Sequence, residues 1–340
     1  SRLAVARRIF RIMKICILSD NIPGHFNQSF GVMHLLFGRS HSNFSVIYVT
    51  PRIHFLRSIT RFLCRLLSKN ITKTKANFIL WTYSINLLDK YDLIIASGGN
   101  TAAVCSAIQF LKVTKSIQLG SPRGLPASNF TAIVTSERYF DSENNVVADI
   151  TPNKYSPNTI NQLSNKDSHI LFCIGGKGIG YEYSDTEWDS FINNVKNIAN
   201  KYEKKICLVT SRRTNPNVER KLALALDSFI DHKESGLFHA GSSNFDLSNA
   251  FSISAHIFVT EDSAMMISES ISSGRPVSTI YPKRINAPIR FKNHIKKYEK
   301  LGFIKRLSIE NFDIDHRNNS SDLVSSNRQI LREQIMELIS

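Results

Sequence analysis

The most constraining feature of this sequence is a repeated order of short apolar run, polar or glycine-bearing loop, and helical segment. Short, mostly apolar runs are typical of parallel strands that helices cover on both faces. We therefore predict an α/β fold. The runs expected to be strands include 14–19, 44–49, 93–97, 169–174, 205–210, 236–239 and 255–260.

This alternation runs through the chain twice, with a break in between. Residues 141–167 are rich in Asn, Ser, Asp and Pro and lack periodicity, which is typical of a domain junction. The 340 residues are enough for two cores. We predict two doubly wound, Rossmann-like domains that face each other across a cleft. The predicted limits are 1–150 for the N-terminal domain, 151–167 for the junction, 168–320 for the C-terminal domain and 321–340 for a C-terminal helix.

Composition limits the classes of protein to which the chain can belong. The sequence has no window of about 18 apolar residues, so no membrane-spanning helix is expected. Residues 1–10 are basic but lack a long apolar core and a cleavage signal, so a secretory peptide is not expected. The five cysteines show no metal-binding spacing, which favours free buried thiols in a reducing compartment.

The net charge of +15 indicates an anionic partner. Between Arg52 and Lys75 there are seven Lys or Arg and no acidic residue. Arginines recur every four residues from Arg57 to Arg65, so 52–69 is predicted as a basic amphipathic helix. Either this helix contacts an anionic membrane, or its apolar face packs in the core and its basic face is solvated. Nucleic acid is not expected, because no basic and aromatic binding motif is present.

Two glutamates eight positions apart, Glu261 and Glu269, follow the predicted strand 255–260. Eight positions is a little over two helical turns, so both can share one face of a cleft. Carboxylates accept hydrogen bonds from vicinal hydroxyls, as in a sugar or a ribose. The alternative is one glutamate favoured by a helix N-terminus and a second that faces solvent. The candidate ligand contacts in this segment are Thr260, Asp262, Ser263 and Glu269.

Two further loops follow predicted strands of the second half. One contains consecutive glycines and a lysine, and the other contains two arginines. Glycine turns at helix N-termini and arginine side chains bind diphosphates, although charges in such turns are often merely solvated. The spacing does not fit a P-loop. The candidates for diphosphate binding are Gly175, Gly176, Lys177, Ser211, Arg212 and Arg213.

The loops of the first half carry a second group of polar candidates. His25 follows the first predicted strand and is a candidate general base for an acceptor hydroxyl. The alternative is a loop that only caps the following helix. Glycines after the strand 93–97 allow the backbone to approach a ligand. The other candidates on this acceptor side are Asp20, Gly24, Asn27, Gln28, Gly98, Asn100 and Arg123.

Six motifs occur in a fixed order: LSDNIPGHFNQSFG, DLIIASGGNTA, IQLGSPR, IGG, VTSRRT and VTEDSAMMISESISSGRPV. Over residues 14–302 this set resembles the family of the plant mitochondrial fission ("elongated mitochondria") protein and its bacterial relatives, glycosyltransferases of the lipopolysaccharide outer core. The resemblance implies a GT-B-like fold. The last motif is similar to the donor-binding signature of GT-B glycosyltransferases. It implies that Glu261, as a catalytic residue, approaches the donor sugar and that Glu269 accepts hydrogen bonds from the ribose.

The resulting hypothesis is a bacterial glycosyltransferase at the cytoplasmic face of the inner membrane. It moves a sugar from a nucleotide-sugar donor to a lipopolysaccharide core or another surface glycan, with a lean towards retention of the anomeric configuration. No predicted apolar strand ends in a D-x-D motif, the pattern that would hold a metal ion. Asp313-Ile314-Asp315 has this pattern but lies in a polar stretch. We therefore expect neither a metal nor a cofactor besides the donor. The alternative is a non-catalytic partner-binding protein on the same scaffold.

Overall fold

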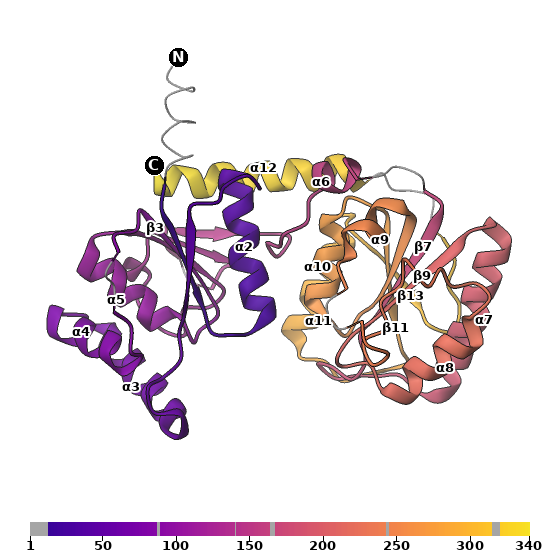
Figure 1. Cartoon of the computed structure of the whole chain (residues 1–340), viewed down its shortest axis with the longest axis horizontal. Coiled ribbons are helices and arrows are strands. Elements are labelled where there is room, and N and C mark those ends of the chain that lie inside the picture. Colours follow the sequence, from indigo (N-terminus) through magenta and orange to yellow (C-terminus); the bar gives the residue numbers. More distant parts are fainter. Residues whose placement is uncertain (1–12, 87–88, 140, 164–166, 243–244, 315–319) are drawn as a thin grey trace, which may run out of the picture. The chain divides into compact units, whose positions relative to one another are not determined.

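The computed structural model describes residues 13–86, 89–139, 141–163, 167–242, 245–314 and 320–340. The predicted α/β class is confirmed, because two parallel sheets alternate with helices along the chain (Figure 1). By contacts the chain divides into unit 1, residues 1–154 and 328–340, and unit 2, residues 155–327. Across these described ranges, no helix combines the length and apolar character needed to cross a bilayer.

Unit 1 contains a six-stranded parallel sheet in the order β2-β1-β3-β4-β5-β6. The first strand has β2 on one side and β3 on the other, so the chain reverses its direction across the sheet at this strand. The strands are β1 (Ile15–Ser19), β2 (Phe44–Tyr48), β3 (Leu93–Ser97), β4 (Lys115–Leu119), β5 (Ala132–Thr135) and β6 (Asn145–Val147).

Helices cover both faces of this sheet because alternate strand residues point to opposite sides. On β1, Ile15 and Ile17 pack with the apolar residues of α2, whereas Cys16 and Leu18 pack towards α3, α4 and α5. The helices of unit 1 are α2 (Pro23–Phe37), α3 (Arg57–Lys69), α4 (Lys73–Thr82) and α5 (Ala102–Lys112), with short 3₁₀ turns at His54–Leu56 and Ala127–Asn129.

The last helix, α12 (Ser320–Ile339), contributes to both units, because residues up to 327 belong to unit 2 and those from 328 to unit 1. Leu331, Ile335 and Ile339 are buried in the same core cluster as Ile15 and Ile17. The core of unit 1 therefore combines the first described strand with the end of the sequence.

Unit 2 contains a five-stranded parallel sheet in the order β13-β11-β10-β7-β9. In Figure 1, α7 and α8 lie on one side of this sheet and α9, α10 and α11 on the other. The strands are β7 (His169–Ile174), β9 (Lys205–Thr210), β10 (Ser254–Thr260), β11 (Val277–Tyr281) and β13 (Lys305–Ser308). The helices are α6 (Pro157–Asn161), α7 (Asp185–Tyr202), α8 (Pro216–Leu226), α9 (Leu247–Ile253), α10 (Ala264–Ser272) and α11 (Ile289–Lys300).

The strands predicted at 93–97, 169–174 and 205–210 have the observed bounds. The strand predicted at 236–239 is wrong, because Gly236 forms only an isolated bridge with Val209 and the chain then turns. The stretch 141–167 contains β6, although its sequence lacks strand periodicity. A small antiparallel pair, β8 (Tyr181–Glu182) and β12 (Arg284–Ile285), was not expected.

All five cysteines are buried and free, as predicted. The basic segment 1–10 lies outside the described residues.

Candidate functional site

In unit 2 the candidate site lies at the carboxyl ends of the parallel strands. β7 comes first in chain order, and it has β9 on one side and β10 on the other. The loops that follow β7 and β10 lead to α7 and α10, which cover opposite faces of the sheet (Figure 1). Doubly wound sheets bind ligands where adjacent loops part in this way. The predicted motifs 175–178 and 260–263 are these two loops.

Hydrogen bonds join the two loops. The amide of Gly175 donates to Oγ1 of Thr260 over 2.7 Å, and the amide of Gly176 donates to Oδ2 of Asp262 over 3.0 Å. A side chain at Gly175 would overlap the Asp262 carboxylate, and one at Gly176, where φ is +148°, would overlap the carbonyl of Arg213. Only glycine fits at both positions, so packing alone requires this glycine pair.

Asp262 is a buried acid at the centre of the loop junction. Its Oδ2 lies 3.4 Å from a terminal nitrogen of Arg213, whereas its buried Oδ1 has no hydrogen-bond partner among the described residues. Burial raises the pKa of Asp262 to about 6, although hydrogen bonds with Thr260 and Gly176 and the charge of Arg213 oppose the shift. The carboxyl group of Asp262 therefore holds the glycine turn in place and can change its protonation state near pH 6.

Glu261 is fully buried and its carboxylate is occupied by other side chains. Nε of Arg306 donates to Oε1 over 2.7 Å and its NH2 group donates to Oε2 over 2.9 Å. Thr279 donates to Oε1 over 2.7 Å and Tyr181 to Oε2 over 3.1 Å. In this structure the carboxylate points into the protein, towards a bidentate arginine. Its predicted contact with a donor sugar therefore stays a prediction that the geometry does not support.

Glu269 lies in the second half of α10 and is partly exposed. Burial raises the pKa of Tyr155 and of Cys173, and the charge of Glu269 adds to both shifts. Glu269 therefore lies near Tyr155 and Cys173. Neither of these residues is a partner of Glu261, so the two glutamates have separate surroundings. Ser263 is the N-cap of α10 and accepts a hydrogen bond from the amide of Met266.

A third loop, after β9, is tied to the glycine turn. Oγ of Ser211 donates to the carbonyl of Gly175 over 3.0 Å, and Thr214 donates to the carbonyl of Ile174 over 2.9 Å. His239 is hydrogen-bonded through Nε2 to the carbonyl of Thr214 at 2.8 Å. These contacts fix the position at which α8 begins.

Beside these loops is a cavity of about 500 Å³, which is large enough for a small-molecule ligand. We call it the unit 2 pocket. Glu261 and Glu269 are absent from the described residues that line it. Those residues are Gly176, Lys177, Glu182, Tyr183, Asp185, Trp188, Arg212, Arg213, Thr214, Asn215, Pro216, Val218 and His239.

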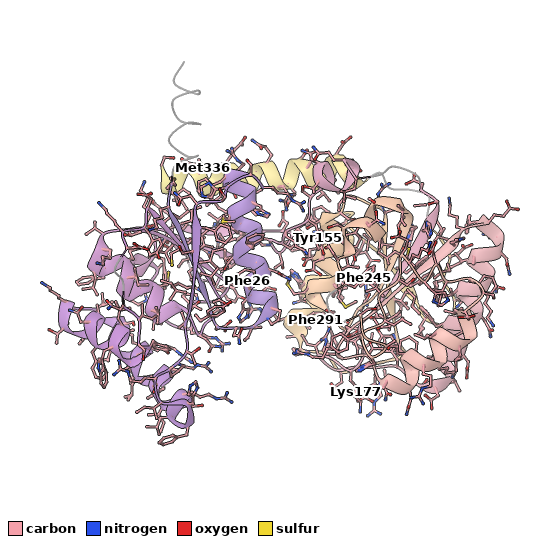
Figure 2. All side chains as sticks on the ribbon, in the orientation of Figure 1. Phe26, Tyr155, Lys177, Phe245, Phe291 and Met336 are labelled. Carbon is pink, nitrogen blue, oxygen red and sulfur yellow. The ribbon has the colours of Figure 1, made fainter. Side chains whose placement is uncertain are left out.

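The unit 2 pocket combines three cations with two helix N-termini. Lys177, Arg212 and Arg213 are exposed side chains on its wall, and Figure 2 shows Lys177 at the outer edge of unit 2. The first turns of α7 and α8 also border it, and the N-cap of α8, Asn215, accepts from the amide of Asn217. Amides and the helix dipole at the N-terminus of α8 attract anions, whereas the N-terminus of α7 is capped by Ser184 and Glu187. The pocket therefore suits a phosphate-bearing ligand.

In unit 1 the corresponding point lies between the loops after β1 and β3. The carboxylate of Asp20 is hydrogen-bonded to Nδ1 of His25 at 3.0 Å and accepts from Nδ2 of Asn100 over 2.9 Å. Burial acts to raise the pKa of Asp20, but these hydrogen bonds outweigh it and lower the pKa. An ionised Asp20 favours the tautomer with a proton on Nδ1, which leaves Nε2 of His25 as an acceptor. The predicted base is thus held in a base-like orientation.

The glycines after β3 are packed against the other predicted residues. At Gly98, where φ is +81°, a side chain would overlap the imidazole of His25. A side chain at Gly99 would overlap that of Arg123. His25, Asn100 and Arg123 therefore surround a single turn, and their role on the acceptor side stays a prediction.

Gln28, Asn27 and Gly24 all lie on α2, close to its N-terminus. Oε1 of Gln28 accepts from Ser97 over 2.9 Å, which links α2 to the end of β3. Gly24 and Asn27 are partly exposed on the same helix.

Sequence reasoning missed several residues of the two sites. Arg306, at the start of β13, is the main partner of Glu261, and its basic side chain lies 45 positions away in sequence. Trp188 and Asp185 were not among the predicted site residues, yet both line the unit 2 pocket. His239 was assigned to a strand that does not form. Of the Asp313-Ile314-Asp315 pattern, Asp315 lies outside the described residues, and Asp313 is paired with Lys201.

We predict that Glu261→Gln lowers the free energy of unfolding by about 2–4 kcal/mol, because it leaves the guanidinium of Arg306 without its counter-charge. Urea unfolding followed by tyrosine and tryptophan fluorescence measures the change. Glu310→Gln, which breaks the exposed pair with Lys283, serves as control and should cost less than about 1 kcal/mol. Equal effects of the two substitutions would show that Glu261 has no structural role.

A second prediction concerns pH. The pKa of Asp262 is raised from 3.8 to about 6 in the folded state, so the folded protein binds more protons than the unfolded chain between these values. Ionisation of Asp262 therefore costs no stability below about pH 4 and its full amount above about pH 6. Relative to wild type, the urea midpoint of Asp262→Asn should rise as the pH increases across this range. A constant offset between the two proteins across this range would contradict the prediction.

Solved structures that are similar to this chain have low sequence identity with it, as three examples show. MnaA of S. aureus in complex with UDP is 15% identical, with 96% of this chain and 91% of that chain covered and a TM-score of 0.41. MurG of Acinetobacter baumannii is 12% identical (95% and 94% covered, TM-score 0.46), and the ADP-heptose lipopolysaccharide heptosyltransferase II of E. coli is 13% identical (96% and 98%, 0.42). At these values the likenesses say nothing about what this chain binds.

No curated protein matches the chain. The predicted GT-B-like class is confirmed as two doubly wound parallel-sheet units, whereas the cleft between them stays a prediction. The model of one protein family, described as mitochondrial fission ELM1, matches residues 23–330. The family predicted from the six ordered motifs is therefore confirmed, and the chain belongs to the mitochondrial fission ELM1 family.

Proposed function

We propose that this protein is a glycosyltransferase that binds a nucleotide-sugar donor in the unit 2 pocket. The observation that carries this proposal is the convergence of Lys177, Arg212 and Arg213 with the N-terminus of α8 around one cavity. A nucleoside diphosphate carries its negative charge into such a site and keeps it when it departs as the leaving group. Fixed cations and amides stabilise this charge without a change in their own positions.

The pocket also suits the nucleoside. Glu182 and Asp185 are acceptors on the wall, and they can take hydrogen bonds from ribose hydroxyls. Tyr183 and Trp188 supply aromatic surface beside them. The identity of the base follows from no single contact, so the proposal covers uridine, guanosine, cytidine and adenosine donors.

For the acceptor, we propose that His25 removes the proton from the attacking hydroxyl. Its Nδ1 is fixed by Asp20, so Nε2 is the atom that accepts the proton, and Asp20 stabilises the imidazolium that forms. The hydroxyl oxygen then bonds to the anomeric carbon as the bond from that carbon to the diphosphate breaks. In this scheme Asp20 and Asn100 are positioning residues.

The stereochemical proposal changes with the geometry of Glu261. The spacing of Glu261 and Glu269 favoured retention, but the carboxylate of Glu261 is held by other side chains. These are Arg306, Thr279 and Tyr181. A base acting directly on the acceptor hydroxyl fits a single displacement, which inverts the anomeric carbon. We therefore propose inversion, with Glu261 as a positioning residue beneath the donor loop.

The acceptor and the location follow from the family resemblance and from α3. We propose a lipopolysaccharide core or another surface glycan as acceptor, without a metal, and a peripheral site at the cytoplasmic face of the inner membrane of a bacterium. Support for membrane contact comes from apolar side chains of α3, such as Phe62 and Leu66, which are exposed in unit 1.

The second candidate is a non-catalytic partner-binding protein on the same scaffold. The burial of Glu261 favours it, because a side chain expected at the sugar is used inside the protein. Nucleotide binding separates the two candidates, since a partner-binding protein has no need of a donor.

We predict that the protein binds at least one of UDP, GDP, CMP and ADP, or its sugar conjugate, with a micromolar Kd in isothermal titration. Arg212→Gln combined with Arg213→Gln should weaken this binding at least about tenfold, or ~1.4 kcal/mol, because two cations leave the pocket. Arg220→Gln, an exposed arginine on α8 outside the pocket, is the matched control and should bind as wild type. Absence of binding to every nucleotide would favour the second candidate.

His25→Gln should lower kcat by about 10²–10⁴-fold and leave the Kd for the nucleotide unchanged, because glutamine cannot act as a base. Release of the nucleoside diphosphate in the presence of core oligosaccharides measures kcat. His232→Gln, at an exposed histidine of unit 2, is the control. If the His25 variant turned over at the wild-type rate, the assignment of the base would be wrong.

A further inference from the structure

The α3 region presents apolar side chains to solvent. Cys64 and Ser68 of this helix are buried, so this side of α3 packs against unit 1 and the opposite side faces outward. A contiguous apolar surface of this kind is uncommon on a monomer and marks a binding surface. The exposed fractions are 87% for Phe55, 57% for Ile59, 59% for Phe62, 47% for Leu63 and 45% for Leu66.

The charge around this surface indicates what covers it. The sequence contains no Asp or Glu between Asp20 and Asp89. Exposed bases on and beside the helix include Arg57 and Lys69. A segment with exposed apolar side chains, and with basic but no acidic residues, is complementary to a bilayer that contains anionic lipids.

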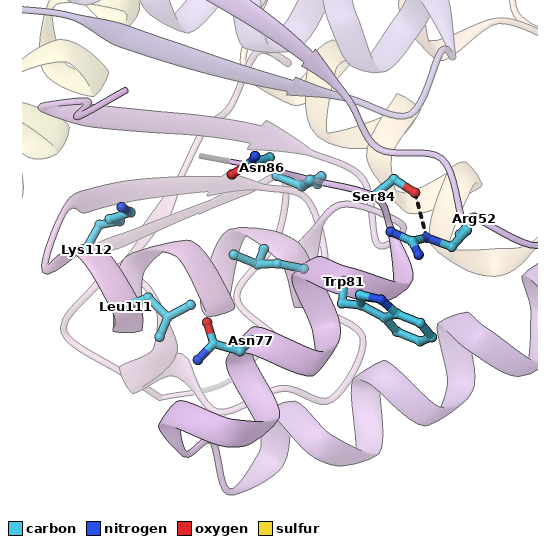
Figure 3. Close-up of a pocket in the computed structure, with 9 residues that line it drawn as sticks. Arg52, Asn77, Trp81, Ser84, Asn86, Leu111 and Lys112 are labelled. Carbon is cyan, nitrogen blue, oxygen red and sulfur yellow. Dashed lines mark hydrogen bonds between the residues drawn. The ribbon is translucent and has the colours of Figure 1, made fainter. Parts of the chain in front are cut away.

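A cavity of about 500 Å³ lies beside α4, the helix that contacts the buried side of α3, and we call it the unit 1 pocket. It is connected to α3 through α4, because Cys64 and Thr82 are within hydrogen-bonding distance at 3.4 Å and the amide of Arg52 donates to the carbonyl of Thr82. Figure 3 shows Arg52 and Trp81 at one end of the pocket and Lys112 at the other.

The polar and apolar groups of the unit 1 pocket suit an anionic amphiphile. Nε of Arg52 donates to Oγ of Ser84 over 3.0 Å, and its guanidinium lies 4.8 Å from the centre of the Trp81 ring (Figure 3). This is the one side-chain hydrogen bond of Arg52 within the described part of the chain, so its terminal nitrogens can bind an anion. Leu80 and Leu111 supply an apolar wall.

Two residues with a positive φ lie at this pocket or next to it: Ser84 lines it, and Val113 follows the lining residue Lys112. Ser84 has φ of +54°, which turns its hydroxyl towards Arg52, and Val113, next to Lys112, has φ of +50°. Val113 is the C-cap residue of α5, where a left-handed conformation is common, although this conformation is costly for a β-branched side chain. The side chain of Val113 is also 93% exposed, although it is apolar.

We propose that the unit 1 pocket binds the phosphate headgroup of an anionic phospholipid while the apolar side of α3 lies in the surface of the bilayer. Arg52 contacts the phosphate, and Lys112 adds positive charge from the other end of the pocket. Trp81, which is 55% exposed, lies at the interface as tryptophans do at membrane surfaces. This inference rests on the proposed membrane contact but not on sugar transfer, and the lipid site is separate from the nucleotide site of unit 2.

The test is flotation of the full chain with vesicles of phosphatidylcholine alone and with vesicles containing about one third phosphatidic acid. We expect binding to the anionic vesicles, with affinity at least about tenfold lower for Arg52→Gln combined with Lys112→Gln. The matched control, Lys205→Gln combined with Lys233→Gln, removes the same charge from unit 2 and should bind within about twofold of wild type. Phe62→Ser combined with Leu66→Ser should weaken binding to both kinds of vesicle.

Equal losses in the pocket variant and its control would overturn the headgroup site and leave membrane contact standing. Absence of vesicle binding by the wild type would overturn both, and nucleotide titration of the same sample then tests the donor site independently. Glycerol 3-phosphate is the soluble probe. If it binds to the pocket and the vesicles do not, the site is specific for a free anion, and the lipid assignment is wrong.

Discussion

Hydrogen bonds between neighbouring loops hold both candidate sites in place. In each unit these loops lie where the chain reverses its direction across the sheet. In unit 2, Asp262 accepts from the amide of Gly176, and in unit 1, Asp20 accepts from Asn100. Each carboxylate crosses the gap between two loops that lead to opposite faces of a sheet. Without these bonds the two loops of each unit could shift relative to each other. The wall of the unit 2 pocket and the orientation of His25 would then no longer be fixed.

Most of what is local could be predicted from the sequence. Apolar runs gave the strands β3, β7 and β9, and the loops after them contain the residues that meet at the sheet edges. The role of Glu261 could not be predicted, because its partner Arg306 comes from β13, and no spacing rule connects the two. The orientation of α3 was equally hidden. An amphipathic pattern defines two faces, but tertiary contacts of Cys64 and Ser68 decide which one is buried.

The geometry moves the proposed donor chemistry from carboxylates to cations. A pair of glutamates was expected to bind the donor. Instead, the buried carboxylate of Glu261 binds Arg306 of β13. The side chains on the wall of the cavity include Lys177, Arg212 and Arg213. This arrangement is consistent with an anionic leaving group, because the buried acid keeps Arg306 in place, Asp262 holds Arg213, and Lys177 and Arg212 remain available to a ligand. In the proposed site, Glu261 therefore affects ligand binding only indirectly, through its contacts inside the protein.

Helix α12 has a consequence for the order in which the protein folds during synthesis. A ribosome releases the chain from its N-terminus, so β1 to β6 emerge early and all of unit 2 follows them. Leu331, Ile335 and Ile339, which complete the core around Ile15 and Ile17, emerge only after unit 2 has left the exit tunnel. Unit 2 can therefore mature first, while the earlier-made half waits with an open apolar face that chaperones can recognise.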